Sequence, residues 1–170
     1  MEIRQLTRLD AEALWKLRLQ ALDTDPEAYA ESATEHRQMT VETLAERLGR
    51  EGSDEFVYGA FDWSTLVGMA GFYREKGSKR RHRGWVWGVF VLPEHRRRGI
   101  GRALVTSLIE CARALPGLTA IFLNVRTTRQ AARRLYASLG FRSIGVDPQA
   151  LSVADHTIAE EHMILNLKFL

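Results

Sequence analysis

The chain has 170 residues, 45% of them hydrophobic, and its 24 Lys and Arg outnumber its 21 Asp and Glu, for a net charge of +3. This length fits a single domain spanning residues 1–170, in which folding buries roughly 70% of the unfolded surface. No apolar run approaches the ~20 residues that cross a membrane. The charged stretch after Met1 differs from the apolar core of a signal peptide. We therefore expect a cytoplasmic protein that does not bind membranes.

Cysteine and histidine are too sparse to suggest a metal site. The single cysteine, Cys111, excludes an internal disulfide and a cysteine-based metal cluster. It shares the apolar face of a predicted helix with Leu104 and Leu108, where we expect a small core side chain rather than a nucleophile. The five histidines are scattered singly and place no ligand pair on one helix face, so we expect no metal.

The first half of the chain has the pattern of a strand, two helices and a hairpin. Asp10 and Thr40 are suitable helix N-caps. The predicted elements are a strand at Glu2–Leu6, a helix from Asp10 to near Pro26, a helix from Thr40 to Gly49, and strands at Phe56–Trp63 and Leu66–Tyr73 that pair across Ser64-Thr65.

The second half alternates strands with helices. Gly84–Leu92 is almost entirely apolar, as expected for a strand at the centre of a sheet. The other predicted elements are a loop at Lys76–Arg83, a helix at Gly99–Ala114, a strand at Ala120–Val125, a helix from about Thr128 to Leu139, and strands at Phe141–Val146 and Glu161–Phe169 joined by a polar connection through Pro148 and Asp155. This order predicts a mixed α/β (α+β) sheet of about seven strands flanked by about four helices.

The most informative segment joins the central strand to the helix after it. Val91-Leu92-Pro93 ends the strand, and Arg96-Arg97-Arg98-Gly99-Ile100-Gly101 opens the helix. The first N–H groups of a helix have no intrahelical partner and lie at the positive end of its dipole, and glycines let a phosphate approach them. The segment therefore predicts a site for a phosphate-bearing cofactor.

Two common phosphate motifs do not fit this segment. A Walker loop requires Lys and Ser/Thr where Arg102 and Ala103 stand, and the dinucleotide fingerprint requires glycine at Leu104. The pattern Arg96-x-x-Gly99-x-Gly101 instead resembles the acyl-CoA loop of the GNAT superfamily of N-acetyltransferases. The family's closing signature is similar to the strand-like run at 121–125, the segment 130–136 with its tyrosine, and Leu139-Gly140-Phe141, so the resemblance covers about residues 85–145.

The resemblance implies a mostly antiparallel sheet that is splayed between its fourth and fifth strands, with acetyl-CoA in the cleft. The fourth strand would bind the pantetheine arm through its backbone, and the N–H of Val91 could also stabilise the tetrahedral oxyanion. The bulky side chains of Trp87, Phe90 and Val91 favour acetyl over a longer acyl chain. The residues implied to bind acetyl-CoA are Val89, Phe90, Val91, Arg96, Arg97, Arg98, Gly99, Ile100, Gly101, Arg102, Asn124 and Arg129.

Catalysis of acyl transfer requires a proton donor and a route for the amine's proton. The resemblance implies that Tyr136 protonates the leaving thiolate, although its spacing also fits an ordinary core face. The general base is unassigned, because Asn124 stands where some family members carry a glutamate and cannot accept a proton. Either a chain of waters removes the proton, or one of these substrate-side residues does: Glu31, Glu35, His36, His156, Glu161 or His162.

These features predict direct transfer of an acetyl group from acetyl-CoA to a primary amine of an unidentified acceptor, small molecule or protein, in a ternary complex. One alternative is an acyl-CoA-binding protein with weak or lost catalysis, which Asn124 supports. Another is a basic nucleic-acid-associated module built on Lys79–Arg83, but no recognition helix or RNA-binding motif accompanies that run. A homodimer is compatible with the sequence.

Overall fold

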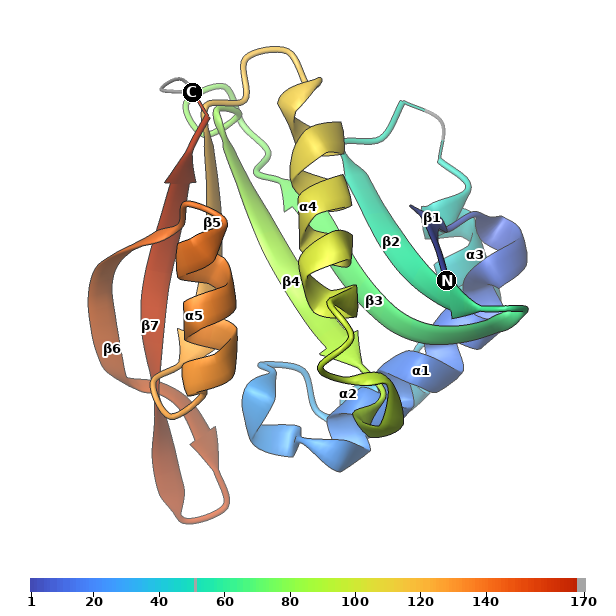
Figure 1. Ribbon diagram of the computed structural model, residues 1–170, viewed down its shortest axis with the longest axis horizontal. Helices are drawn as coiled ribbons and strands as arrows, with labels where there is room; N and C mark the ends of the chain where they lie inside the picture. Colours follow the sequence, from blue (N-terminus) through green and yellow to red (C-terminus); the bar gives the residue numbers. More distant parts are fainter. Residues whose placement is uncertain (51, 168–170) are drawn as a thin grey trace.

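A computed structural model of the chain describes residues 1–50 and 52–167 and contains one seven-stranded sheet (Figure 1). The strand order is β1-β2-β3-β4-β5-β7-β6, and every neighbouring pair is antiparallel except β4 and β5. The strands are β1 (Glu2–Gln5), β2 (Glu55–Asp62), β3 (Thr65–Arg74), β4 (Arg83–Val91), β5 (Ala120–Arg126), β6 (Arg142–Val153) and β7 (His156–Asn166). The predicted mixed, mostly antiparallel sheet is confirmed.

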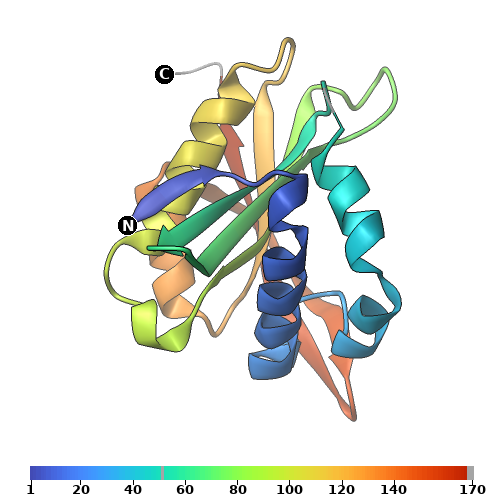
Figure 2. The ribbon, with the colours of Figure 1, turned by 90° about the vertical axis from the view of Figure 1, so that its right-hand side faces the viewer.

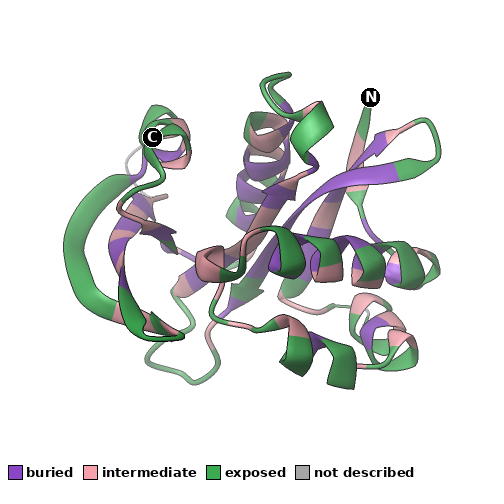
Figure 3. Cartoon of the chain, turned by 90° about the horizontal axis from the view of Figure 1, so that it is seen from below, coloured by how far each residue is buried: buried purple, intermediate pink, exposed green. Residues whose placement is uncertain are grey.

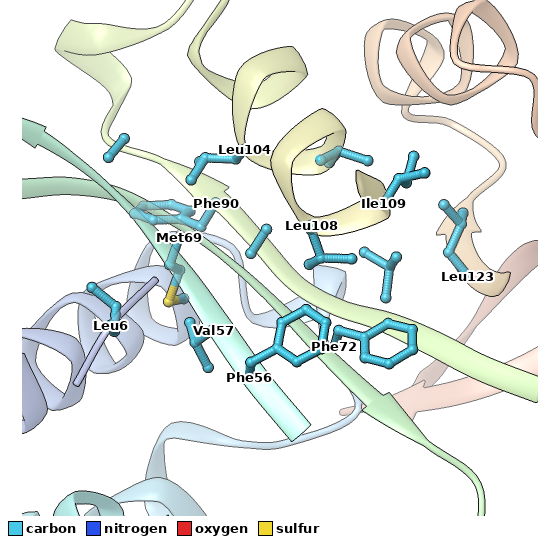
Figure 4. Packing of buried hydrophobic residues seen from close by; sticks show 14 of the residues in the cluster. Leu6, Phe56, Val57, Met69, Phe72, Phe90, Leu104, Leu108, Ile109 and Leu123 are labelled. Carbon is cyan, nitrogen blue, oxygen red and sulfur yellow. The ribbon is translucent and has the colours of Figure 1, made fainter. Parts of the chain in front are cut away.

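Helices cover both faces of this sheet. They are α1 (Ala11–Thr24), α2 (Ala33–Gln38), α3 (Val41–Leu48), α4 (Ile100–Arg113) and α5 (Gln130–Ser138). α1 and α3 lie on one face and α4 on the other (Figure 2), while α5 covers β5 and β7 (Figure 1). Leu104 and Leu108 project from α4 toward the sheet, near Phe90 and Phe72 (Figure 4), and neither leucine is exposed. Cys111 packs half-buried against the same core.

The central feature of the sheet is a gap between β4 and β5. The two strands pair only from Arg83 with Ala120 to Trp85 with Phe122, and then they diverge. At this point the register between β3 and β4 shifts, and Gly88 adopts a left-handed conformation with φ of 63°. A β-bulge bends its strand, and glycine adopts this φ without strain, so the bulge directs the end of β4 away from β5. The expected splay between the fourth and fifth strands is confirmed.

Two expectations about individual elements are wrong. The helix α2 lies between the first two predicted helices, where we predict no element, so the described residues contain one helix more than expected. Its N-terminus is a capping box: the Ser32 hydroxyl accepts the Glu35 N–H at 3.1 Å, and the Glu35 carboxylate accepts the Ser32 N–H at 2.7 Å. This polar signal lies outside any apolar periodicity and is easily missed.

The polar connection predicted through Pro148 and Asp155 is mostly strand. β6 continues to Val153 and β7 begins at His156, so only Ala154-Asp155 form the turn. β6 is the outermost strand and its side chains from Arg142 to Gln149 are exposed (Figure 3), so they lack the alternation that identifies a half-buried strand. The predicted end of the last strand at Phe169 lies outside the described residues.

An ion pair connects β1 to the start of α1. The Arg4 guanidinium donates to both carboxylate oxygens of Asp10, at 2.9 and 2.7 Å, and the Thr7 N–H donates to Asp10 at 2.8 Å. The hydrogen bonds from Arg4, followed by those from Thr7, lower the pKa of Asp10 to about 2. Because this pKa lies below the unfolded value, the carboxylate stabilises the fold above about pH 4 and loses this effect as the pH falls toward 2.

We expect Asp10→Asn to lower the free energy of unfolding by about 1 kcal/mol at pH 7, since Arg4 is partly exposed and solvent screens the pair. The difference from the parent chain should shrink steadily as the pH is lowered from 4 toward 2. Urea denaturation across this pH range measures it. A loss of stability that does not change with pH would contradict the assignment.

Candidate active site

The gap between β4 and β5 opens into a cleft of about 590 Å³. Its wall includes β4 from Val86 to Val91, the loop that leads into α4, the end of β5 and the inner face of α5. Arg98 is exposed and does not line it. The sequence-predicted site residues that do line it are Val89, Phe90, Val91, Arg96, Arg97, Gly99, Ile100, Gly101, Arg102, Asn124, Arg129 and Tyr136.

The N-terminus of α4 presents backbone donors to this cleft. Gly99 is the N-cap, with φ of 78° and no side-chain cap, and its carbonyl accepts the first intrahelical bond from Ala103 at 3.0 Å. The N–H groups of residues 100–102 therefore have no acceptor within the helix. A Cβ at Gly99 would meet nothing within 4 Å, so the approach to these donors is open. Free N–H groups at the positive end of a helix dipole suit a phosphate.

The arginines around the α4 terminus are held in place by protein acceptors. Arg97 takes a left-handed φ of 63°, which is uncommon for a side chain with a Cβ. The three partnered arginines are Arg96, which donates to the Val91 carbonyl at 2.9 Å, Arg102, which donates to the Ser138 hydroxyl, and Arg129 at the start of α5, which pairs with Asp25. The contacts of Arg96 and Arg102 fix positive charge near the phosphate-binding donors, whereas the charge of Arg129 is paired with a carboxylate.

Two side chains already donate hydrogen bonds to carbonyl groups on the edge of β4 that faces the gap. The Tyr29 hydroxyl donates to the Val89 carbonyl at 3.3 Å, and the Arg96 side chain donates to the Val91 carbonyl. Burial raises the pKa of Tyr29 to about 12, so its hydroxyl stays a neutral donor. A carbonyl oxygen has two lone pairs, and each of these carbonyls can therefore accept a second hydrogen bond from a peptide-like ligand.

Tyr136 is positioned by the end of its helix. The Phe141 N–H donates to the Tyr136 carbonyl at 3.1 Å and the Gly140 N–H donates to the Ala137 carbonyl at 3.0 Å. Gly140 has a φ of 95°, which completes a Schellman motif, and Phe141 packs edge-on against the Tyr136 ring with centroids 6.0 Å apart. The Gly-Phe pair that follows the helix therefore fixes the direction of the tyrosine side chain.

The Tyr136 side chain is in the state that a proton donor requires. Burial, and to a smaller extent the nearby Tyr29, raise the pKa of Tyr136 well above its usual value of 10. The phenol therefore keeps its proton at neutral pH. None of the described residues occupies its hydroxyl with a hydrogen bond, so the hydroxyl is available to a ligand in the cleft.

The candidate bases from the sequence are distributed over several places. Glu161 points toward α5 and pairs with Arg133, and Glu35 is used in the cap of α2. His156 pairs with Glu27 at 2.9 Å at the mouth of the cleft. Glu31 and His36 lie together in a second cavity under α1. His162 is opposite Asn124 in the pairing of β7 with β5.

Sequence reasoning missed Glu160. It is only 8% exposed and lies two residue pairs along from the Asn124–His162 pair, opposite Arg126. Burial raises its pKa; Asp147 raises it further, while His162 and a hydrogen bond from Asn124 lower it. Alternate residues of a strand share a face, so Glu160 is on the side of β7 that carries His162, while Glu161 is on the other. Only the pairing of β7 with β5 brings this carboxyl beside Asn124.

A cluster of ion pairs closes one side of the cleft mouth. Arg126 of β5 lies 3.5 Å from Asp25 and 2.5 Å from Glu27, both in the connection between α1 and α2. Arg129 also pairs with Asp25, and His156 at the β6–β7 turn pairs with Glu27. Three segments far apart in sequence are thereby joined beside the gap.

Three arginines of the basic run Lys79–Arg83 form ion pairs with two neighbouring carboxylates. Arg80 and Arg83 lie 3.1 and 3.0 Å from Glu75, and Arg81 lies 3.7 Å from Asp54. These arginines form a hairpin loop with local ion pairs rather than a bare positive surface.

Within residues 1–50 and 52–167, no helix combines the length and apolar character of a membrane-spanning segment. Over the same ranges, no three His, Cys, Asp or Glu side chains are grouped so that they could hold a metal ion.

The family model described as the acetyltransferase (GNAT) family matches residues 15–141, which are most of the chain. The chain belongs to this family, as the motifs around Gly99 and Tyr136 indicate.

Individual relatives agree with this assignment. N-alpha-acetyltransferase RimI of Mycobacterium tuberculosis is 39% identical over 88 residues, which are 52% of this chain and 52% of that protein. The matched regions span about half or less of the curated relatives. The GNAT-family acetyltransferase of Streptococcus pneumoniae has the same fold, with a TM-score of 0.88 at 22% identity over 98% of this chain and 99% of that chain. YncA of Salmonella typhimurium, solved with its cofactor acetyl-CoA, has a TM-score of 0.83 at 25% identity, covering 98% of this chain and 94% of that chain.

Proposed function

We propose that the chain is a single-domain N-acetyltransferase over residues 1–170 that moves the acetyl group of acetyl-CoA to a primary amine within a ternary complex. The observation that carries this proposal is the cleft itself. It brings the free N–H groups of α4, the edge of β4 and the hydroxyl-bearing face of α5 to one gap in the sheet. The yncA structure of the same fold holds acetyl-CoA, and the mycobacterial relative is named an N-alpha-acetyltransferase.

The residues of the cleft fit the parts of acetyl-CoA. The N–H groups of residues 100–102 suit the pyrophosphate, with Arg97 beside them. The backbone of β4 from Val89 to Val91 suits the pantetheine arm, which contains amide groups like those of a peptide. The N–H of Val91 is a fixed donor for the oxyanion, and such a donor is worth more in a closed cleft than in water. Acetyl-CoA supplies the activated thioester.

In this proposal two side chains carry out the proton transfers. Tyr136 holds its proton at neutral pH and donates it to the leaving sulfur. Glu160 accepts the proton of the amine through water near Asn124, which itself cannot accept one. Glu160 thereby takes the role for which the sequence left no obvious candidate on the fourth or fifth strand.

We expect Glu160→Gln to reduce kcat by about 100-fold, the lower end of what a general base contributes. Because burial raises the pKa of Glu160, its ionisation at pH 7 opposes folding, so the variant should be as stable as the parent or more stable. The parent should lose activity as the pH falls through this raised pKa, above the usual value of 4.5, and the variant should lose that dependence. Steady-state rates and thermal unfolding test both statements. A less stable variant with unchanged kcat would show a purely structural role.

The proposal is tested by the release of free CoA thiol from acetyl-CoA in the presence of a panel of amines. The panel contains a polyamine, free amino acids, amino acid amides and short peptides with free N-termini. Amine-dependent thiol release, with an acetylated product seen by mass spectrometry, supports the proposal. Binding of acetyl-CoA without transfer to any amine would favour the alternative of an acyl-CoA-binding protein.

A further inference from the structure

A second cavity lies on the face of the sheet opposite α4. It has a volume of about 310 Å³ and lies beneath α1, α2 and α3, over the start of β2, the end of β3 and the middle of β4. Trp87 lines both this cavity and the cleft, so the two spaces are neighbours beside the bulge in β4. Most of its wall is apolar and includes Leu14, Met39, Leu44, Leu48, Phe56 and Val57.

Arg18 lines the cavity and lies against Gly88, which lines the cleft. Its side chain is 9% exposed, its Nε donates to Glu31 at 3.0 Å, and its guanidinium lies 4.5 Å from the Tyr29 ring. The Nη1 atom is 3.3 Å from the position that a Cβ on Gly88 would take, and it has no hydrogen-bond partner among the described residues. A buried guanidinium donor without an acceptor is costly, and a ligand oxygen would satisfy it.

Two neighbouring side chains hold Arg18 in place. Glu31 is shared between Arg18 and His36, whose Nδ1 lies 3.3 Å from the Glu31 carboxylate. The other ring nitrogen of His36 lies 3.0 Å from the Trp15 carbonyl, so both nitrogens face acceptors. Glu31 and His36 thus hold the Nε side of the Arg18 guanidinium, and its Nη1 remains without a partner among the described residues.

We propose that the acceptor is a small α-amino acid with an apolar side chain; this inference rests on the proposed acetyl transfer. The amine must reach the thioester in the gap beside Gly88, and the unpartnered Nη1 of Arg18 lies against the same glycine. The acceptor therefore carries its amine and an oxyanion within a few bonds of each other, as an α-amino acid does. Its carboxylate binds Arg18, and its side chain occupies the cavity beside Leu14 and Met39.

If this assignment is right, the site binds a free amino acid more tightly than the N-terminus of a protein. The first residue of a polypeptide has an amide in place of the carboxylate. An amide gives Arg18 a neutral acceptor, whereas a carboxylate adds an opposite charge and can accept two parallel N–H bonds from the guanidinium. A polypeptide must also continue beyond its first residue, whereas α1, α2 and α3 cover much of the cavity.

The test compares leucine, methionine and phenylalanine with their amides and with 3-methylbutylamine, which lacks any carboxylate. Binding to the chain in the presence of CoA is measured by calorimetry, and kcat/KM is measured by thiol release. We expect each free amino acid to exceed its amide by roughly 10- to 100-fold in both measurements, the range for a hydrogen bond to a charged group. In Arg18→Gln this preference should disappear while the affinity for acetyl-CoA stays unchanged. Arg18→Lys, which keeps the charge, should retain part of the preference.

The outcomes distinguish this inference from the proposed function. Amides, peptides or the simple amine binding as tightly as the free amino acids would overturn the inference, whether or not they are acetylated. Equal losses for acid and amide in Arg18→Gln would assign Arg18 a structural role and would also overturn it. Failure of acetyl-CoA itself to bind would overturn the proposed function, and the calorimetric preference for the free acid would then decide the inference alone.

Discussion

Gly99→Glu is expected to abolish acetyl-CoA binding in a chain that still folds. The substituted carboxylate would stand at the N-cap of α4, where it would occupy the free N–H groups and repel the pyrophosphate. Nothing lies within 4 Å of a Cβ at this position, so the side chain has room. The left-handed φ of 78° costs a residue with a Cβ about 1 kcal/mol, which a domain tolerates. We expect the Kd for acetyl-CoA, measured by calorimetry, to rise about 100-fold or more, because the substitution removes several charge-assisted hydrogen bonds to the pyrophosphate.

Gly77→Glu is the matched control for this variant. Gly77 has a left-handed φ of 95° and also has no atom within 4 Å of its Cβ position, but it lies in the hairpin loop after β3 and outside the cleft. It should show the same strain and the same added charge with unchanged acetyl-CoA affinity. Equal affinities in the two variants would disprove the placement of the pyrophosphate at α4.

The second large effect is expected for Tyr136→Phe, which should lower kcat by about 100-fold or more. The substitution removes only the hydroxyl, and this hydroxyl makes no hydrogen bond to a described residue. The free energy of unfolding and the Kd for acetyl-CoA should therefore stay close to those of the parent. Since burial raises the pKa of Tyr136 above 10, the parent should lose no activity through ionisation of this residue at any pH below about 10.

Tyr58→Phe is the control for the tyrosine. Tyr58 is a half-buried residue of β2 that lies outside both cavities, and loss of its hydroxyl should leave kcat unchanged. Thiol-release rates with saturating acetyl-CoA and amine measure both variants. If Tyr136→Phe retains full kcat, its ring belongs to the core alone and the proton reaches the sulfur from solvent.

The cofactor-binding part of this site can be predicted from the sequence because its determinants are contiguous. A strand end, two glycines and a helix start lie between Val91 and Gly101, and the geometry of a helix terminus follows from local hydrogen bonding. The same holds for Tyr136, because the Gly140-Phe141 pair that positions it follows within one turn of the helix. Such local signals also gave most of the strand and helix positions within a few residues.

The residues that we propose to act on the acceptor cannot be identified from contiguous sequence signals. Glu160 meets Asn124 only through the pairing of β7 with β5, and Arg18 meets Gly88 only through the packing of α1 over β4. The neighbouring Glu161 looks equivalent in the sequence, but the strand alternation directs it to Arg133 instead. The second half of strand β6, from Asp147 to Val153, was not predicted for a related reason, since an exposed outer strand needs no apolar face.

The most direct test of the central claim is thermal unfolding with acetyl-CoA, CoA or NAD, each at roughly 100 times its expected Kd. A ligand that binds only the folded chain should then add about 2.7 kcal/mol to the free energy of unfolding, seen as a rise in Tm of a few degrees. Stabilisation by acetyl-CoA and CoA, with none by NAD, is the predicted result. If neither CoA compound changes the Tm, the cleft between β4 and β5 is not an acyl-CoA site, and the proposed acetyl transfer is contradicted.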